Sequence, residues 1–139
     1  MNTRPFSNAL EKLKVAGLRP TRQRLALAKL LTERGHRHVT AEELYQEARQ
    51  AQIPVSLATI YNTLHQFTTA GILREVAVDM GQSYFDTNTS HHHHFFDEAS
   101  GELSDIPADA VEIGRLPAPP ADREIDSVEV IVRLRSRAS

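Results

Sequence analysis

Four consecutive histidines, His91 to His94, are the residues of this chain whose types and spacing are best suited to chemistry. Imidazole nitrogens bind transition metals, and carboxylates join them around zinc, ferrous iron or manganese. Histidine is also an axial ligand of haem iron. Acidic side chains that can complete such a site lie nearby, namely Asp86, Asp97, Asp105 and Glu112. The segment therefore predicts a site for a divalent metal ion, for haem or for both.

A run of four histidines is also typical of an affinity tag or of an ordinary solvated segment. Tags stand at chain termini, whereas this run lies between segments with predicted structure. If the run begins a strand, successive side chains point to opposite faces. His91 and His93 can then meet one ion, while His92 and His94 approach another.

The residues after the histidines predict the strands that position them. His93 to Asp97 and Glu102 to Ile106 flank a turn at Ser100-Gly101 and predict a β-hairpin. Pro107 to Val111 predicts a single helical turn. Apolar and polar side chains alternate from Ile125 to Leu134, as they do in a partly buried strand.

The first half of the chain has the pattern of a small helical domain. The first three predicted helices begin at a serine or threonine that can cap them, and glycines end three of the four. Thr40 and Glu43 form a capping box. The predicted helices run from Ser7 to Ala16, from Thr21 to Gly35, from Thr40 past Ala48, and from Leu57 to Gly71.

The fourth predicted helix has one apolar stripe and one polar face that is almost uncharged. A short turn, Ile53-Pro-Val-Ser56, separates it from the third helix, and a predicted hairpin of Ile72 to Val78 and Ser83 to Asp86 follows. This order is typical of a winged helix-turn-helix, whose second helix enters the DNA major groove. The stripe is Leu57, Ile60, Leu64 and Phe67, and the opposite face is Ala58, Tyr61, Asn62, His65 and Gln66.

Charge separates the chain into halves of opposite sign. Residues 1–80 hold 11 Lys/Arg and 7 Asp/Glu, a net +4, whereas residues 81–139 hold 5 and 11, a net −6. A basic half indicates a surface for phosphates. Asparagine can pair with adenine, tyrosine and alanine can contact a thymine methyl, and arginines can bind phosphates or a minor groove. The candidate DNA contacts are Arg19, Thr21, Arg22, Arg24, Ser56, Ala58, Thr59, Tyr61 and Asn62.

Length and cysteine content narrow the class of protein. Two small domains in 139 residues need help to be stable, and without cysteine neither a disulfide nor a thiolate-bound zinc can provide it. Dimerisation remains as the source of stability. No apolar run is long enough to span a membrane, and the first residues resemble an amphipathic helix rather than a signal peptide. We therefore expect a cytoplasmic protein with no membrane partner.

Several motifs together carry a resemblance to the ferric uptake regulator superfamily. They are Gly17-Leu-Arg-Pro-Thr-Arg-Gln-Arg24, His38-Val-Thr-Ala-Glu-Glu-Leu-Tyr45 and Ser56-Leu-Ala-Thr-Ile-Tyr-Asn-Thr-Leu64. Within the superfamily the chain is most similar to the iron response regulator branch of alphaproteobacteria. That similarity rests on Tyr61-Asn62, where other branches usually have Tyr-Arg, on Tyr84-Phe-Asp-Thr-Asn88 and on His92-His-His-Phe-Phe96.

The resemblance implies an α+β fold, with a winged helix-turn-helix domain over residues 1–86 and an α/β domain for dimerisation and metal or haem sensing over residues 87–139. It implies a homodimer that reads a pseudo-palindromic operator near iron- and haem-related genes. It also implies two metal sites. One joins the two halves through His38, Asp86, His94 and Asp105; the other uses His91, His93 and Glu112.

Three departures from the family pattern change these expectations. The further histidine of the second metal site falls on or near Val128, which leaves that site incomplete. Asp97 and Ser100 occupy the places of a cysteine pair, which excludes zinc held by four thiolates. The branch senses haem, in some members through a cysteine-containing motif that this chain lacks. Haem would therefore bind through His91, His92, His93 or His94, with His38 and His65 as secondary candidates.

The sequence thus predicts a DNA-binding regulator of iron- or haem-responsive genes, controlled by Fe, Mn, Zn or haem at the histidines. In the resembling branch DNA binding is expected when haem is scarce and is lost when haem binds. A haem or metal carrier that does not bind DNA is the alternative. A metal-dependent hydrolase is a further alternative, but the chain has no nucleophile motif and no phosphate loop, so we expect no enzyme.

Overall fold

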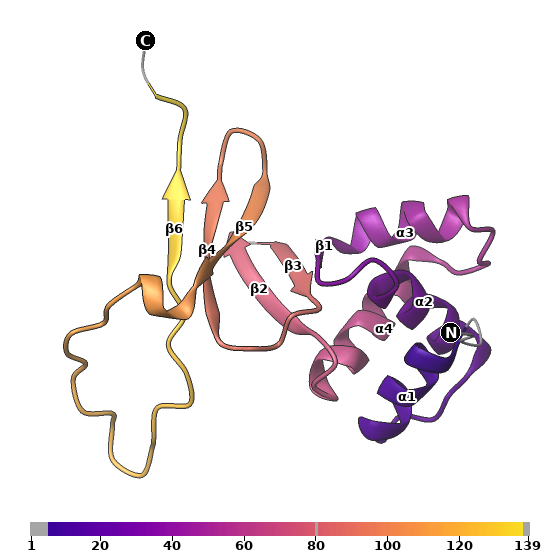
Figure 1. Ribbon diagram of the computed structural model, residues 1–139, viewed down its shortest axis with the longest axis horizontal. Helices are drawn as coiled ribbons and strands as arrows, with labels where there is room; N and C mark the ends of the chain where they lie inside the picture. Colours follow the sequence, from indigo (N-terminus) through magenta and orange to yellow (C-terminus); the bar gives the residue numbers. More distant parts are fainter. Residues whose placement is uncertain (1–5, 80, 138–139) are drawn as a thin grey trace. The chain divides into compact units, whose positions relative to one another are not determined.

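The computed structural model describes residues 6–79 and 81–137, and the chain divides into two compact units, Met1–Thr89 and Ser90–Ser139. Figure 1 shows helices in the first unit and mainly strands in the second. Met80, in the predicted turn of the first hairpin, lies outside the described residues. So do residues 1–5 and 138–139.

Four helices form the first unit, as the sequence predicts. Two begin at the predicted caps: the side chains of Thr21 and Thr40 accept backbone N–H groups, and Thr40 with Glu43 forms the capping box. Ser56, which the sequence predicts in the turn, caps α4 in the same way. The helices are α1 (Ser7–Val15), α2 (Arg22–Thr32), α3 (Ala41–Gln50) and α4 (Leu57–Thr69).

Two predicted helix ends are wrong. Ser7 is the first residue of α1 rather than its cap; Phe6 holds that position, with no hydrogen bond from its side chain. Helix α2 ends at Thr32 and not at Gly35, because the chain must leave the helix early enough to reach the strand at His38. Gly35 lies in the connecting turn with φ of 77°, a conformation that glycine adopts without strain.

The core of the first unit lies where the helices meet. Leu13, Leu27, Leu44, Ile60 and Phe67 are completely buried, and the predicted stripe of α4 supplies the last two together with Leu64. Burial of this stripe leaves the opposite face of α4 in solvent. The packing therefore orients α4 relative to α3 and sets which side chains face outward.

A three-stranded antiparallel sheet completes the first unit. The predicted hairpin is β2 (Arg74–Asp79) and β3 (Gln82–Asp86), and a short strand that the sequence did not predict, β1 (His38–Val39), pairs with β3 in the order β1-β3-β2. In this register His38 lies opposite Asp86. Two residues are too few to produce an alternating pattern, so β1 is visible only in the structure.

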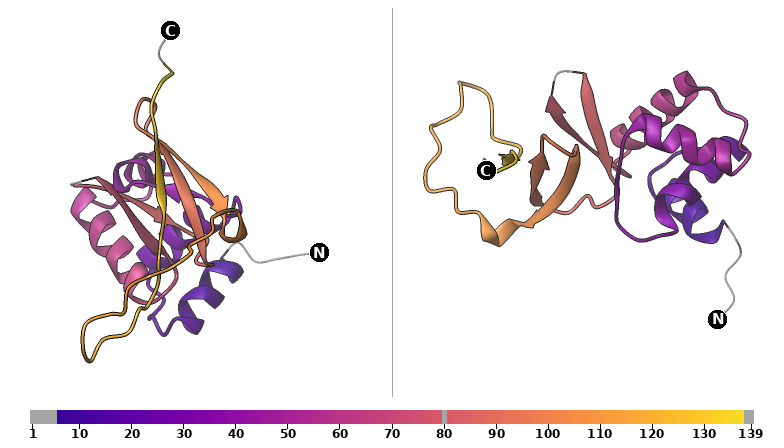
Figure 2. Two further views of the ribbon diagram at one scale, coloured as in Figure 1. Left: turned by 90° about the vertical axis from the view of Figure 1, so that its left-hand side faces the viewer. Right: turned by 90° about the horizontal axis from the view of Figure 1, so that it is seen from above.

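The second unit is a sheet in the order β5-β4-β6. The predicted hairpin is β4 (His92–Asp97) and β5 (Glu102–Pro107), and the predicted helical turn is a 3-10 helix, η1 (Ala108–Ala110). A long irregular segment then returns the chain to β6 (Ile131–Leu134), which runs parallel to β4. Figure 2 shows this segment leaving the sheet before it returns.

The last strand is shorter than the predicted Ile125 to Leu134. Ile131 lies opposite His94, so residue 129 falls opposite His92, where β4 begins. Residues 125–128 therefore extend past the end of β4 and have no strand of this unit beside them. The alternating pattern predicts a strand here, but β6 can pair only where β4 lies beside it.

The two units give the expected α+β class, with a winged helix-turn-helix first unit. None of the helices among the described residues is long and apolar enough to cross a membrane.

Arg37 ties three elements of the first unit together. Its guanidinium donates to both carboxylate oxygens of Glu47 on α3 and to the carbonyl of Leu30 on α2. The hydrogen bond that Arg37 donates to Glu47 raises the pKa of Arg37, so the guanidinium stays charged. The Arg37 backbone pairs with Thr87, which donates its N–H to the Arg37 carbonyl and accepts the Arg37 N–H at Oγ1.

We expect Arg37→Ala to destabilise the first unit by about 1–3 kcal/mol, because it leaves the half-buried Glu47 carboxylate without its bidentate partner. Urea unfolding followed by circular dichroism measures the change. The control is Arg34→Ala, an exposed arginine in the same turn, which should change stability by less than about 0.5 kcal/mol. Equal unfolding midpoints for both variants would show that the Arg37 contacts contribute nothing.

Candidate functional site

The first unit contributes a pair of metal-ligand side chains, His38 and Asp86. His38 Nε2 lies 3.4 Å from Asp86 Oδ2. Asp86 is 1% exposed and His38 is half-buried. A buried carboxylate is costly unless it is paired or bound to a metal, so this pair is a strong candidate for half of a metal site.

Neighbouring hydrogen bonds hold this pair in place. The β1 and β3 register sets His38 opposite Asp86, and the Arg37 and Thr87 backbones pair immediately beside them. The other carboxylate oxygen of Asp86, Oδ1, accepts the backbone N–H of Asn88 at 2.9 Å. The first unit therefore presents a preformed nitrogen and a preformed oxygen ligand.

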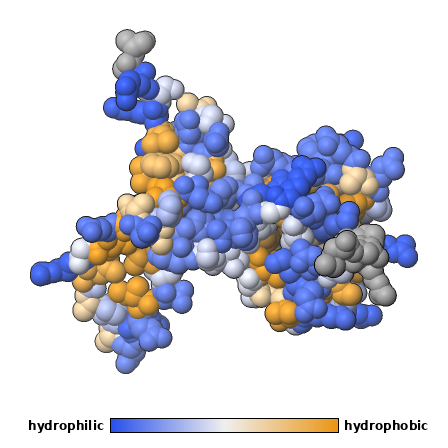
Figure 3. Space-filling model, in the orientation of Figure 1, coloured by the Kyte–Doolittle hydropathy of each residue, from blue (hydrophilic) through white to orange (hydrophobic). Residues whose placement is uncertain are grey.

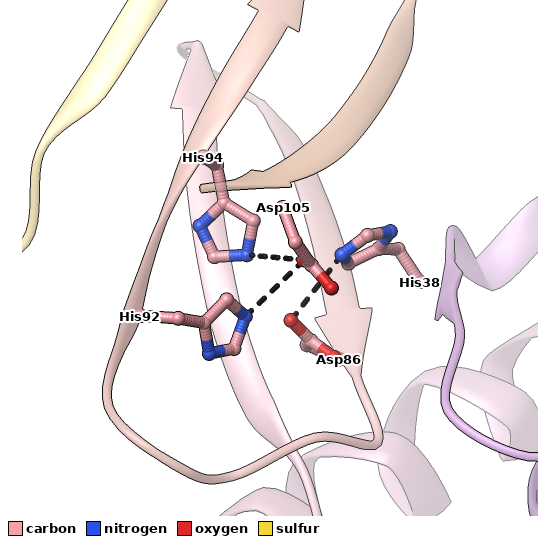
Figure 4. Close-up of side chains that lie close together, drawn as sticks. All are labelled: His38, Asp86, His92, His94 and Asp105. Carbon is pink, nitrogen blue, oxygen red and sulfur yellow. Dashed lines mark ion pairs between the residues drawn. The ribbon is translucent and has the colours of Figure 1, made fainter. Parts of the chain in front are cut away.

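The second unit contributes three ligand side chains, His92, His94 and Asp105. The Nε2 atoms of His92 and His94 lie 3.3 Å and 3.6 Å from Asp105 Oδ1. Each of the three offers one ligand atom, and these atoms lie within 4.8 Å of one another. Figure 4 draws these residues and the His38 and Asp86 pair, with dashed lines for the ion pairs inside each unit.

The hairpin brings the three ligands together. His94 lies opposite Asp105 in the β4 and β5 register, and His92 lies two residues earlier on the same face of β4. The rings of His92 and His94 are 4.5 Å apart, and those of His91 and His93 are 5.0 Å apart, so the predicted alternation is confirmed.

His92 is the ligand candidate that the family pattern missed, since the expected set held only His38, Asp86, His94 and Asp105. Strand alternation, by contrast, does predict it, because it pairs His92 with His94 around one ion. Both groups of candidate ligands consist of imidazoles and carboxylates, donors that suit ferrous iron, manganese or zinc.

The expected second site has less support from local geometry. His93 is 1% exposed, and its Nδ1 accepts the backbone N–H of Val130 at 3.0 Å. Glu112 lies exposed beyond η1, and Val128 is half-buried. A neutral His93 that accepts at Nδ1 carries its proton on Nε2, so the ring cannot ligate an ion until that proton leaves.

The four predicted haem ligands differ in how far they are exposed to solvent. His92, His93 and His94 are 5%, 1% and 0% exposed, whereas His91 is exposed. A small ion can reach buried imidazoles that already converge. A flat macrocycle needs an accessible ring, and of these four histidines only His91, just before β4, provides one. Of the secondary candidates, His65 is exposed and His38 is half-buried.

The turn between β4 and β5 is held without thiolates. Asp97 Oδ1 accepts the N–H of Ala99 at 2.9 Å, and Ser100 Oγ accepts the N–H of Glu102 at 3.2 Å. Asp97 and Ser100 are the residues at the places of the missing cysteines. Their side chains satisfy the turn backbone directly, as aspartate and serine do in other tight turns.

The outward face of α4 is the candidate DNA-reading surface. Tyr61 and Asn62 are exposed beside Ala58, as the sequence predicts. Tyr61 donates its hydroxyl to Glu42 on α3 at 2.7 Å, and this hydrogen bond is the main reason that the pKa of Tyr61 is raised. The phenol is therefore neutral and held in one direction before it meets any partner.

Other predicted DNA contacts already have structural roles. Ser56 and Thr21 cap helices, and Thr59 accepts the Ser56 hydroxyl. Arg24 donates to the Arg19 carbonyl at 2.9 Å and to Gln66 on α4 at 3.2 Å, which connects the start of α2 with the outward face of α4. The side chains of Arg19 and Arg22 are exposed.

Comparison with known proteins identifies the family. The sequence profile of the ferric uptake regulator family matches residues 15–119. The peroxide-responsive repressor PerR of Staphylococcus aureus is 37% identical over 101 residues, which cover 73% of this chain and 68% of that protein. The corresponding repressor of Staphylococcus epidermidis is 38% identical over 101 residues, which cover 73% and 67%.

Solved structures agree with these matches. The ferric uptake regulator of Pseudomonas aeruginosa with manganese has a TM-score of 0.72 at 25% identity and covers 94% of this chain and 98% of that one. The regulator of Vibrio cholerae has a TM-score of 0.71 at 26% identity, with 91% and 98% covered. The sequence matches and the shared fold lead to one conclusion: the chain belongs to the ferric uptake regulator family, whose members are transcription regulators and not enzymes.

Proposed function

We propose that the chain is a homodimeric DNA-binding repressor in which one divalent metal ion, shared by both units, controls operator binding. The observation that carries the proposal is the pair of incomplete ligand sets: His38 with Asp86 in the first unit, and His92, His94 and Asp105 in the second. Because imidazoles and carboxylates lie on both sides of a short linker, this arrangement suits a conformational switch better than a catalytic site.

Ligand number supports a shared ion. Structural zinc takes four ligands and manganese prefers six, so neither two nor three side chains complete a site. Five residues separate Asp86 from His92, and a chain of that length spans at most about 20 Å. The linker therefore keeps the two ligand sets near each other whatever angle the units adopt. An ion that binds both sets selects the arrangements in which they meet.

The first unit supports DNA as the partner. Its helix-turn-helix presents an uncharged polar face on α4, with exposed arginines at the start of α2. Bases are read by such side chains in the major groove, and phosphates are bound by arginine. A shared ion that sets the position of this unit in each protomer would set the spacing of the two recognition helices on a pseudo-palindrome.

The second unit supports a second copy of the chain as the protein partner. Of the large apolar side chains exposed among the described residues, six of nine belong to this unit, and Figure 3 shows apolar side chains along β6 and over the crossover segment. Strand β6 has only β4 beside it. Exposed apolar residues on an edge strand favour pairing with another chain. The six are Phe95, Ile113, Leu116, Ile125, Val132 and Leu134.

Haem is the finer proposal for the effector, from the resemblance to the iron response regulator branch. His91 is the exposed ring through which haem iron would bind, and haem at the buried rings would compete with the ion for the same nitrogens. Either event releases the operator in this proposal.

Peroxide sensing is the second candidate. It is favoured by the 37% identity to the peroxide-responsive repressor of Staphylococcus aureus and by a ligand set built only from histidine and aspartate. Ferrous iron at this site would make operator binding sensitive to peroxide, whereas manganese, which does not reduce peroxide readily, would not.

One titration separates these effectors. Operator affinity is measured for metal-free protein, for protein with Mn²⁺, with Fe²⁺ before and after hydrogen peroxide, and with haem. The proposed switch predicts tight binding with Mn²⁺ and weak binding without metal. Loss of operator binding with haem supports the iron response regulator proposal. Loss of operator binding after peroxide treatment of the Fe²⁺ protein, but not of the Mn²⁺ protein, supports peroxide sensing. Equal affinity in every state contradicts metal control.

We expect Asp105→Ala to weaken Mn²⁺ binding about tenfold or more and to weaken metal-dependent operator binding with it. Asp105 is exposed, so the variant should fold. His94→Ala should act in the same direction. His36→Ala, which removes an exposed histidine from the first unit, is the control and should change neither affinity. Unchanged Mn²⁺ affinity in both ligand variants would show that these residues do not bind the metal.

We expect Asn62→Ala to relax base preference at one operator position by about 1–3 kcal/mol. Arg19→Ala should instead weaken binding to every sequence and flatten the salt dependence, because a phosphate contact carries no sequence information. Competition binding with singly substituted operators measures both effects. Unchanged base preference in the Asn62 variant would show that the residue does not read a base.

We expect Val132→Asp to dissociate the dimer, because it places a charge on the exposed face of β6. The side chain is 37% exposed in the single chain, so the protomer should tolerate the change. Sedimentation and operator binding should both show the loss. Ser127→Asp, in the exposed segment before β6, is the control. A variant that remains dimeric places the interface elsewhere.

A further inference from the structure

Glu129 lies beside a predicted metal ligand but belongs to no family motif named above. It precedes β6, and its Oε1 is 3.3 Å from Nδ1 of His94. Both atoms are buried from solvent. The neighbouring backbone fixes this approach: His94 donates its N–H to the Val130 carbonyl at 3.1 Å, and the Val130 N–H donates to His93 Nδ1.

The two nitrogens of His94 face different carboxylates. Nε2 faces Asp105 on β5, and Nδ1 faces Glu129 on the other side of the ring. A neutral imidazole carries one proton, and only the other nitrogen can bind an ion. When that proton lies on Nδ1, the nitrogen that faces the Glu129 carboxylate 3.3 Å away, Nε2 is left to bind metal.

His92 shows the same arrangement with a different acceptor. Its Nδ1 lies 2.7 Å from the Ser90 carbonyl, which can only accept, so the proton is on Nδ1 and Nε2 faces Asp105. In His93, which lies between them, the proton is on Nε2 instead, because its Nδ1 accepts a backbone N–H. His92 and His93, on opposite faces of β4, therefore carry their protons on different nitrogens, and the two rings on the Asp105 side, His92 and His94, direct Nε2 toward Asp105.

We infer that Glu129 is a positioning residue for the metal site: its carboxylate holds His94 in the Nδ1-protonated tautomer and makes Nε2 a stronger ligand. Outer partners of this kind fix the ring and raise its basicity, and their loss typically costs 10- to 100-fold in metal affinity. The inference rests on the proposed metal site. It gives the segment before β6 a role in the metal site, although that segment supplies none of the proposed ligands.

The first test uses metal-free protein. Nitrogen-15 NMR of the histidine rings reports the tautomer of each, and we expect His92 and His94 with the proton on Nδ1 and His93 with the proton on Nε2. Glu129→Ala should shift His94 toward a mixture and leave His92 unchanged, since its acceptor is a backbone carbonyl. His94 with its proton on Nε2 in the unsubstituted protein would overturn the inference without any metal measurement.

The second test measures Co²⁺ affinity by chelator competition and the visible spectrum of bound Co²⁺. Glu129→Ala should weaken binding 10- to 100-fold and alter the spectrum, while Glu129→Gln, which keeps an acceptor oxygen but loses the charge, should fall between. Glu124→Gln removes the same charge from an exposed position and is the control. Unchanged affinity and spectrum in both Glu129 variants would overturn the inference. Failure of the unsubstituted protein to bind Co²⁺ would instead contradict the proposed function, and the tautomer test would still decide the role of Glu129.

Discussion

Burial of three adjacent imidazoles on one strand is the constraint on which the second unit depends. A buried neutral histidine has one nitrogen that must donate and one that must accept, and leaving either unsatisfied is costly. Strand β5 supplies Asp105, and the segment before β6 supplies Glu129 and the Val130 backbone. The parallel strand β6, separated from β5 by a long irregular segment, is thus tied to the same residues that form the ligand group.

A comparable constraint links the ligands of the first unit to its DNA-reading helices. His38 and Asp86 lie on paired strands, and Arg37, next to His38, is bound to Glu47 on α3. Helix α3 in turn contacts the recognition helix through the hydrogen bond from Tyr61 to Glu42. The candidate ligands His38 and Asp86 are therefore connected to the outward face of α4 through contacts within the first unit.

The two kinds of effector proposed here, a divalent ion and haem, would compete for the same imidazole nitrogens. Family membership establishes a transcription regulator, while the choice among manganese, ferrous iron and haem depends on which ligand reaches the rings. Three of the four consecutive histidines are buried, which favours a small ion there, and the exposed His91 is available to a larger ligand. The side chains of Asp97 and Ser100 accept backbone N–H groups in the turn after β4.

Local patterns were sufficient for much of the fold and for most of the site. Apolar periodicity and capping residues predicted four helices, and the alternation of His91 to His94 predicted which rings share a face, because both depend on spacing of a few residues. Tertiary structure decided the rest. The two-residue strand β1 exists only because β3 pairs with it, and β6 begins at Ile131, opposite His94, rather than at the predicted Ile125. The contact of Glu129 with His94 joins residues 35 positions apart, which no local spacing can predict, since it depends on the register of a parallel strand pair.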